Sequence, residues 1–176
     1  VLIHAGTGGV GHVAIQIAKY LGARVATTVS NEAKAEQARA LGADDIIFYR
    51  DESVEDYKQR LTNGKGFSLV FDTVDKSIEA AAVNGRLCSI NTRSTHDLSQ
   101  MHAKSLTLHV IFRSISLLHG IGMDDQPRLV KAMCDMLEQG KVKPLLDTQR
   151  YKFTQISDAH RRIESGEAVG KILLER

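Results

Sequence analysis

The chain has 176 residues, of which 43% are hydrophobic, 25% are charged and only two are proline. This composition is typical of a globular domain and excludes intrinsic disorder. The formal net charge is +2 and the basic residues are scattered along the chain, so nucleic acid is not an expected partner.

The first part of the chain alternates apolar segments of strand length with helical segments. Continuous apolar strands separated by helices are typical of a parallel sheet that is covered on both faces. The pattern therefore predicts an α/β, doubly wound domain over residues 1–122. Strands are expected over 1–5, 24–30, 45–49, 68–73, 87–90 and 106–112, and helices over 10–21, 31–41, 53–61 and 78–83.

After Gly122 the strand and helix alternation of the sheet stops. An amphipathic helix is predicted over 127–138, a brief extended piece over 151–153, a helix over 156–165 and a terminal strand over 171–174. We assign residues 123–176 to a separate C-terminal tail.

A glycine-rich motif, G-x-G-x-x-G, follows the first predicted strand and opens the first helix, with its glycines at Gly6, Gly8 and Gly11. Gly6 permits the tight turn, Gly8 lets a pyrophosphate approach the backbone, and Gly11 lets the helix pack close to the sheet. The N-terminus of the helix offers free N–H groups and a positive dipole to the anion. The strand–turn–helix context therefore predicts dinucleotide binding.

The residues after the second strand favour NADPH over NADH. NAD-specific proteins usually place an acidic residue there for the ribose 2′-hydroxyl, whereas this chain has Ser30, followed by Lys34 in the next helix. Ser30 can donate a hydrogen bond to a 2′-phosphate, and Lys34 can supply positive charge. In an alternative interpretation Ser30 is only the helix N-cap and Lys34 only a solvated residue. Glu32 opposes a phosphate site unless its side chain turns outward.

Several segments together resemble the cofactor-binding half of the medium-chain dehydrogenase/reductase superfamily. The resemblance is to its quinone oxidoreductase-like branch, which is related to the zinc-type alcohol dehydrogenases, and it extends over almost the whole chain. The segments are HAGTGGVGHVAIQIAKYLGARVATTVS, KAEQARALGADDIIFYR, LVFDTV, GRLCSI and VGKILLE.

The resemblance implies a set of cofactor-binding residues in addition to Gly6 and Gly11. It assigns four residues to the pyrophosphate, three to the 2′-phosphate, five to the adenine and nicotinamide portions, and three to the nicotinamide carboxamide. In that order they are Thr7, Gly8, Gly9 and Val10; Ser30, Lys34 and Tyr49; Thr73, Ile90, Asn91, Thr92 and Arg93; and His109, Val110 and Ile111.

The same resemblance implies that a β-rich catalytic domain precedes Val1 and that residues 123–176 return to complete it. Val1 already lies inside a predicted strand, so we expect a fragment. The segment between Val74 and Gly85 is several residues shorter than the helix that the family has there. Without the catalytic domain, the tail is expected to expose apolar surface.

Other catalytic and metal-binding classes are disfavoured. The seven histidines lack metal-motif spacing, no tyrosine precedes a lysine by four residues as in short-chain dehydrogenases, and there is no nucleophile elbow or P-loop. A methyltransferase would need an acid at the end of the second strand. Cys88 and Cys134 are expected to be inert buried thiols, and two such cysteines are compatible with a reducing cytoplasm. No catalytic residue is assigned, because Asp72 is better explained as a loop cap.

The sequence therefore predicts the NADPH-binding portion of an oxidoreductase that transfers hydride to a quinone, an enone or a similar carbonyl substrate. The fragment itself is expected to be catalytically incompetent. The alternative is a non-catalytic nucleotide-sensing or scaffold protein with the same fold. No apolar run reaches the roughly 20 residues of a membrane span, and no signal peptide is present, so a soluble protein is expected. The apolar strand over 106–112 predicts a homodimer through its edge.

Overall fold

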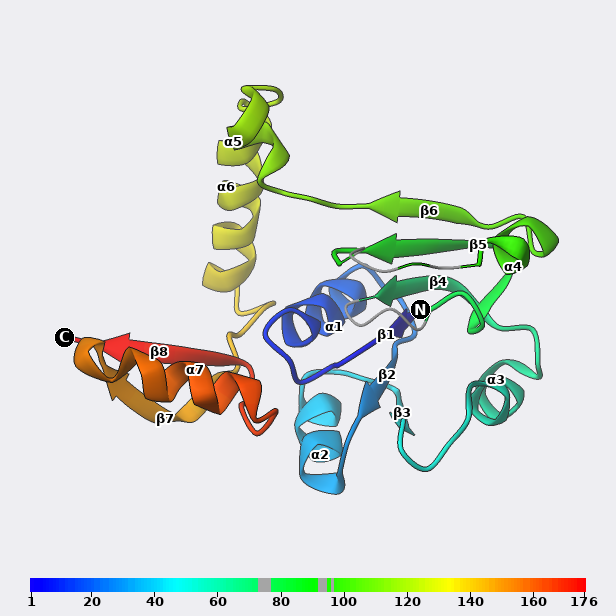
Figure 1. Ribbon diagram of the computed structural model, residues 1–176, viewed down its shortest axis with the longest axis horizontal. Helices are drawn as coiled ribbons and strands as arrows, with labels where there is room; N and C mark the ends of the chain where they lie inside the picture. Colours follow the sequence, from blue (N-terminus) through cyan, green and yellow to red (C-terminus); the bar gives the residue numbers. More distant parts are fainter. Residues whose placement is uncertain (73–76, 92–94, 96) are drawn as a thin grey trace.

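Six parallel strands form the larger sheet of the computed structural model, which describes residues 1–72, 77–91, 95 and 97–176 (Figure 1). Their spatial order is β3-β2-β1-β4-β5-β6. This is the order of a doubly wound dinucleotide-binding sheet, with the reversal between β1 and β4, and it confirms the predicted fold class. The strands are β1 (Leu2–Ile3), β2 (Ala26–Val29), β3 (Asp45–Phe48), β4 (Phe67–Asp72), β5 (Ala81–Ser89) and β6 (Thr107–Val110).

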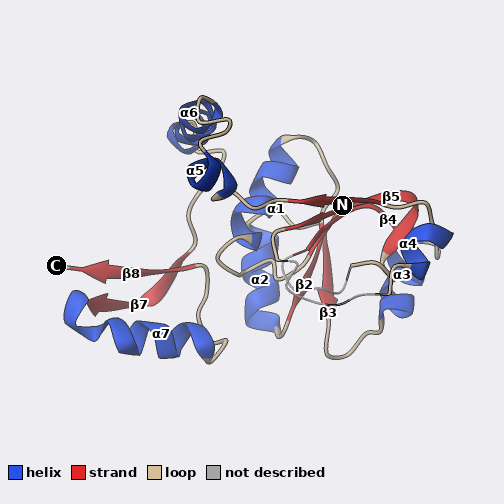
Figure 2. Ribbon diagram, turned by 45° about the horizontal axis from the view of Figure 1, so that its top comes forward, coloured by secondary structure: helices blue, strands red, loops and turns tan. Residues whose placement is uncertain are grey.

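Helices cover both faces of this sheet, as Figure 2 shows. Helices α1 (Gly11–Tyr20) and α2 (Glu32–Ala40) lie on one side, and α3 (Val54–Thr62) and the short α4 (Ser99–Ala103) lie on the other. Successive strand residues point to opposite faces, so Leu2 and Ile3 enter two different core clusters. Ile3 packs in the cluster that holds Ile15 of α1, and Leu2 packs in the cluster that holds Tyr57 of α3.

The helix expected over 78–83 is wrong, because β5 already begins at Ala81 and the three residues before it form a turn. Ala81 pairs with Phe67 of β4, and the Phe67 N–H donates to the carbonyl of Ala80. Both alanines are buried in the sheet core. Strand pairing and burial thus override the helical propensity of this alanine-rich segment.

The C-terminal part builds a separate, two-stranded parallel sheet, in agreement with the end of the alternation after Gly122. Its first strand starts earlier than the expected piece over 151–153. No residue of α6 is buried, and Figure 1 shows α5 and α6 standing apart from both sheets. The elements are α5 (Ile115–His119), α6 (Asp125–Glu138), β7 (Leu146–Lys152), the 3₁₀ turn η1 (Phe153–Gln155), α7 (Ile156–Glu164) and β8 (Lys171–Glu175).

Candidate dinucleotide site

The loop between β1 and α1 packs so tightly that two of its glycines admit no side chain. A Cβ on Gly6 would lie 2.2 Å from Oγ1 of Thr27, and a Cβ on Gly11 would lie 2.1 Å from the carbonyl oxygen of Ala5. Both distances are far below van der Waals contact. The glycine spacing in the sequence is therefore a packing requirement of this turn.

Two threonines of β2 hold the glycine loop against the sheet. The Thr27 hydroxyl donates to the Ile3 carbonyl (2.7 Å), and the Thr28 hydroxyl accepts from the Ala5 N–H (2.9 Å). Ala5 has a φ of 53°, so it lies in the left-handed region that is unfavourable for alanine. The Thr28 hydrogen bond helps to hold Ala5 in this conformation, and the sequence pattern alone gave no sign of it.

The loop presents unpaired donors at the start of α1. Within the described residues, the N–H groups of Gly9, Val10 and Gly11 have no backbone acceptor. The first turn of α1 contains no acidic residue, and the buried His12 ring donates from Nδ1 to the Gly8 carbonyl (2.8 Å). Free N–H groups at the positive end of a helix form a cradle that suits a pyrophosphate.

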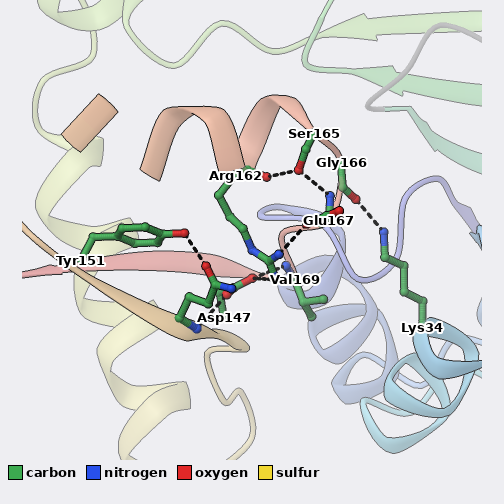
Figure 3. Close-up of polar contacts among 9 residues, drawn as sticks. Lys34, Asp147, Tyr151, Arg162, Ser165, Gly166, Glu167 and Val169 are labelled. Carbon is green, nitrogen blue, oxygen red and sulfur yellow. Dashed lines mark hydrogen bonds and ion pairs between the residues drawn. The ribbon is translucent and has the colours of Figure 1, made fainter. Parts of the chain in front are cut away.

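The predicted 2′-phosphate residues follow the carboxyl ends of β2 and β3 in the chain. The N–H of Tyr49, just after β3, donates to the Val29 carbonyl of β2 (3.3 Å), which brings Tyr49 next to the strand end that Ser30 follows. Asn31 is the N-cap of α2 and accepts from the Lys34 N–H (3.0 Å), so the N-cap interpretation of Ser30 is wrong. The Lys34 ammonium donates to the Gly166 carbonyl (3.0 Å), as Figure 3 shows, so Lys34 is not merely solvated.

Two further charged side chains lie near the carboxyl ends of β2 and β3. Glu32 accepts a hydrogen bond from Arg39 (2.6 Å), so its carboxylate is engaged along its own helix. The guanidinium of Arg50 lies 5.7 Å from the centroid of the Tyr49 ring, within the range of a cation–π contact. Arg50 is not among the predicted site residues, although its position directly after Tyr49 at a strand end is a usable signal.

The predicted residues of the other half lie at the carboxyl ends of β5 and β6. The Ile111 N–H donates to the Ser89 carbonyl (2.9 Å), and the Ser89 hydroxyl donates to the Asn91 carbonyl (2.8 Å). Ile90 follows β5 directly, while His109 and Val110 end β6. The structure thus brings these residues to the carboxyl ends of the strands, where the glycine loop also lies. The predicted residues Thr73, Thr92 and Arg93, and the side chain of Asp72, lie outside the described part.

The C-terminal tail contacts the glycine loop, which the sequence did not predict. The Gly170 N–H donates to the carbonyl of Thr7 (2.8 Å), and Thr7 is buried. Gln16 of α1 exchanges two hydrogen bonds with the backbone of Lys143, at 2.9 and 2.8 Å. Residues 143–145 and 166–171 therefore lie against the start of the first βα unit, and we call them the C-terminal strap.

A buried carboxylate fixes the strap from within (Figure 3). Asp147 is 1% exposed and accepts hydrogen bonds from the N–H groups of Gln149 and Val169, both at 2.9 Å, and from Arg162 at 3.4 Å. Burial by itself would raise the pKa of Asp147, but these donors outweigh it and hold the pKa below its ordinary value. Arg162 also pairs with Glu167 (2.8 Å).

Other candidate sites are poor in chemistry. Within the described residues, no three His, Cys, Asp or Glu side chains come together in a way that could hold a metal ion. Cys134 is exposed, contrary to expectation, because α6 buries none of its residues. Cys88 is half-buried rather than fully buried, and this burial raises the pKa of its thiol. A cavity of about 170 Å³ near Arg24 and Phe67 lies at the amino ends of the strands, away from the glycine loop, and is too small for a dinucleotide.

Among the described residues, no helix is both long and apolar enough to cross a bilayer.

Solved structures share the whole arrangement. The Escherichia coli quinone oxidoreductase in complex with NADPH is 26% identical, with a TM-score of 0.88 over 99% of this chain and 56% of that chain. A mycobacterial protein in complex with NADPH is 28% identical, with a TM-score of 0.86 and coverages of 99% and 57%. An alcohol dehydrogenase superfamily protein from Novosphingobium aromaticivorans is 34% identical, with a TM-score of 0.86 over 93% of this chain and 50% of that chain.

Curated proteins and a family model also match the chain. A highly reducing polyketide synthase from Emericella nidulans is 31% identical over 99% of this chain, which is 7% of that protein. A reducing polyketide synthase from Gibberella moniliformis is 32% identical over 99% of this chain and 8% of its own length. The chain thus spans less than a tenth of these relatives and about half of the solved chains. The family model for zinc-binding dehydrogenases matches residues 41–174, and the chain belongs to this family.

Proposed function

We propose that the chain is the NADPH-binding part of an oxidoreductase that reduces a polarised double bond, such as that of a quinone, an enone or a similar carbonyl compound. The observation that carries the proposal is the donor-lined glycine loop at the strand-order reversal of a zinc-binding dehydrogenase sheet. Ligands of doubly wound sheets bind in the crevice outside the carboxyl ends of the strands, at this reversal.

The described residues fit a dinucleotide phosphate. The N–H groups of Gly9, Val10 and Gly11 can receive the pyrophosphate, and the packing at Gly6 and Gly11 keeps side chains out of its way. When bound, NADPH supplies the hydride, and the protein contributes position and polarity. On this proposal Ile90 and Asn91, after β5, and His109, Val110 and Ile111, at the end of β6, line the nicotinamide side.

The 2′-phosphate corner supports a preference for NADPH. Ser30 directly follows β2, Lys34 lies in the first turn of α2, and the Tyr49 N–H donates to the last residue of β2. No acidic residue follows this strand directly. Arg50 adds a guanidinium that is exposed and stacked on Tyr49. Glu32, which would repel the phosphate, is held by Arg39. The positive charges of Lys34 and Arg50, with the Glu32 carboxylate paired to Arg39, favour the dianionic 2′-phosphate of NADPH over the 2′-hydroxyl of NADH.

The substrate class is proposed from the relatives. Structural neighbours include a quinone oxidoreductase, and the sequence relatives are reducing polyketide synthases. Substrates of both kinds contain carbonyl groups, and a conjugated carbonyl makes a carbon atom electrophilic enough to accept hydride.

Calorimetric titration of the purified protein with NADPH and NADH at matched low salt tests the proposal. NADPH is expected to bind at least about tenfold more tightly, a difference of about 1.4 kcal/mol. Lys34→Gln and Arg50→Gln should each weaken NADPH several-fold and leave NADH unchanged. The charge-matched control is Lys65→Gln, because Lys65 is exposed and lies just before β4, at the amino ends of the strands. Equal affinities for the two nucleotides would refute the assignment of a 2′-phosphate site to Ser30, Lys34 and Tyr49. No binding of either nucleotide would refute the proposed function.

A further inference from the structure

The turn that follows α7 reaches the side chain of Lys34. The Lys34 ammonium, which belongs to the first turn of α2, donates to the Gly166 carbonyl at 3.0 Å (Figure 3). An ammonium has three N–H groups, and among the described residues this carbonyl is the one hydrogen-bond acceptor of Lys34. Two donors therefore stay available to a phosphate, and the Gly166 carbonyl limits the directions in which they point.

Glu167 brings a carboxylate within reach of the same ammonium. The carbonyl carbon of Gly166 is bonded to the nitrogen of Glu167, so the Cα of Glu167 lies about 3 Å from the carbonyl oxygen and at most about 6 Å from the Lys34 ammonium. A glutamate side chain can span this distance. Because the Glu167 side chain is 69% exposed, its ion pair rather than packing decides where its carboxylate lies.

Arg162 of α7 provides that ion pair. Its Nη1 donates to the Glu167 carboxylate (2.8 Å), and its Nη2 donates to the buried carboxylate of Asp147 (3.4 Å). The Arg162 side chain is only 19% exposed, so the guanidinium is the fixed partner. Asp147 also accepts from the Val169 N–H (2.9 Å), so one carboxylate holds both the guanidinium and the backbone that carries Glu167 (Figure 3).

We infer that Arg162 is a positioning residue for cofactor selectivity, because it holds the Glu167 carboxylate away from Lys34. The inference rests on the proposed function, in which Lys34 serves the 2′-phosphate. A released Glu167 carboxylate would accept from the Lys34 ammonium and repel the dianionic 2′-phosphate of NADPH. The 2′-hydroxyl of NADH is uncharged and can donate to a carboxylate, as it does in NAD-specific proteins. Loss of Arg162 therefore shifts the preference from NADPH towards NADH.

Calorimetric titration of Arg162→Gln with NADPH and NADH tests the inference. NADPH should bind about fivefold more weakly than to wild type, because a free carboxylate lies near its phosphate, whereas NADH should not lose affinity in this way. The lost contact with Asp147 acts on both nucleotides alike, so the ratio of the two affinities is the readout. The double variant Arg162→Gln/Glu167→Gln should recover the wild-type ratio, because it has no carboxylate to release. Glu167→Gln alone should keep this ratio.

Ser165→Glu tests the same idea with Arg162 in place. Ser165 is exposed and directly precedes Gly166, while Arg162 is already paired with Glu167 and Asp147. The new carboxylate should weaken NADPH about fivefold relative to Ser165→Gln, the uncharged variant of the same size, and leave NADH unchanged.

The outcomes separate this inference from the proposed function. A wild-type ratio of affinities in Arg162→Gln overturns the inference and leaves the proposed function intact. The same holds for an equal loss of both nucleotides that the double variant does not change, and for a Ser165→Glu protein that binds NADPH as tightly as Ser165→Gln. Absence of nucleotide binding in the wild-type protein refutes the proposed function, and the inference falls with it.

Discussion

Asp147 shows how a single buried residue can hold a distant binding loop. Its carboxylate accepts from Val169, the residue before Gly170, and Gly170 in turn donates to Thr7 of the glycine loop. The chain of contacts therefore runs from the interior of the C-terminal sheet to the cofactor site. A polar group with this burial is stable only because each of its oxygens meets donors.

Asp147→Asn should lower the free energy of unfolding by about 3 kcal/mol at neutral pH, because the amide nitrogen would face N–H donors and Arg162 would lose a partner. The folded-state pKa of Asp147 lies below its ordinary value, so the carboxylate stabilises the fold fully above about pH 5. This contribution disappears as the pH falls through the folded-state pKa. The stability difference between wild type and variant should therefore shrink between pH 5 and the acid limit, measured by urea denaturation.

Asp135→Asn is the matched control for that experiment. Asp135 forms an exposed ion pair with Lys131 on α6 (3.0 Å), and such pairs contribute little to stability. Its unfolding free energy should stay within about 0.5 kcal/mol of wild type. A pH-independent difference between wild type and Asp147→Asn would contradict the role given to the carboxylate.

At the scale of elements, the described end of the connection between β4 and β5, residues 77–80, contains a turn that a lysine holds. The Lys104 ammonium, which follows α4, donates to the carbonyls of Ile78 (3.0 Å), Glu79 (2.9 Å) and Ala81 (3.2 Å). Burial lowers the pKa of Lys104, with a further contribution from Lys58. The ammonium satisfies three carbonyls that a helix would have satisfied internally.

Lys104→Met keeps the aliphatic stem and removes these three donors. We expect it to lower the free energy of unfolding by about 2 kcal/mol, because the carbonyls lose a charged partner in a half-buried place. Lys65→Met, at an exposed site just before β4, should change the free energy of unfolding by less than about 0.5 kcal/mol. Chemical denaturation measures the free energy of unfolding of both variants. If Lys104→Met and Lys65→Met are equally stable, Lys104 does not hold the turn.

The elements also show what a sequence can and cannot predict. The strands, α1 to α3 and the glycine loop follow from local periodicity and turn chemistry, which act over a few residues. Local periodicity does not predict the turn before Ala81, because burial in the sheet outweighs the helical preference of alanine. The C-terminal strap cannot be predicted in this way, because the contact between Gly170 and Thr7 joins distant segments and leaves no periodic signal.

At the scale of the whole molecule, apolar surface is concentrated where the chain lacks partners of its own. Helix α6 buries none of its residues, and α5 and the turn after it expose Leu117, Leu118 and Ile121. At the other end of the sheet order, every residue of β6 is exposed, with Leu108 and Val110 on a strand that has no outer neighbour among the described elements. Surfaces of this kind usually mark contacts with another domain or another copy.

We propose that two copies join through the free edge of β6 into one continuous sheet. The Ile111 N–H points to β5, so by alternation the N–H groups of Leu108 and Val110 point outward and are available to a second strand. Leu108→Pro removes one outward donor and leaves the pairing with β5 intact, since proline is tolerated on an edge with its ring nitrogen facing out. It should raise the dimer dissociation constant about tenfold or more in sedimentation experiments, whereas Leu108→Ala, which keeps the N–H, should have a smaller effect. A wild-type protein of monomer mass at micromolar concentration, or a Leu108→Pro variant that associates as tightly as wild type, would rule out this interface.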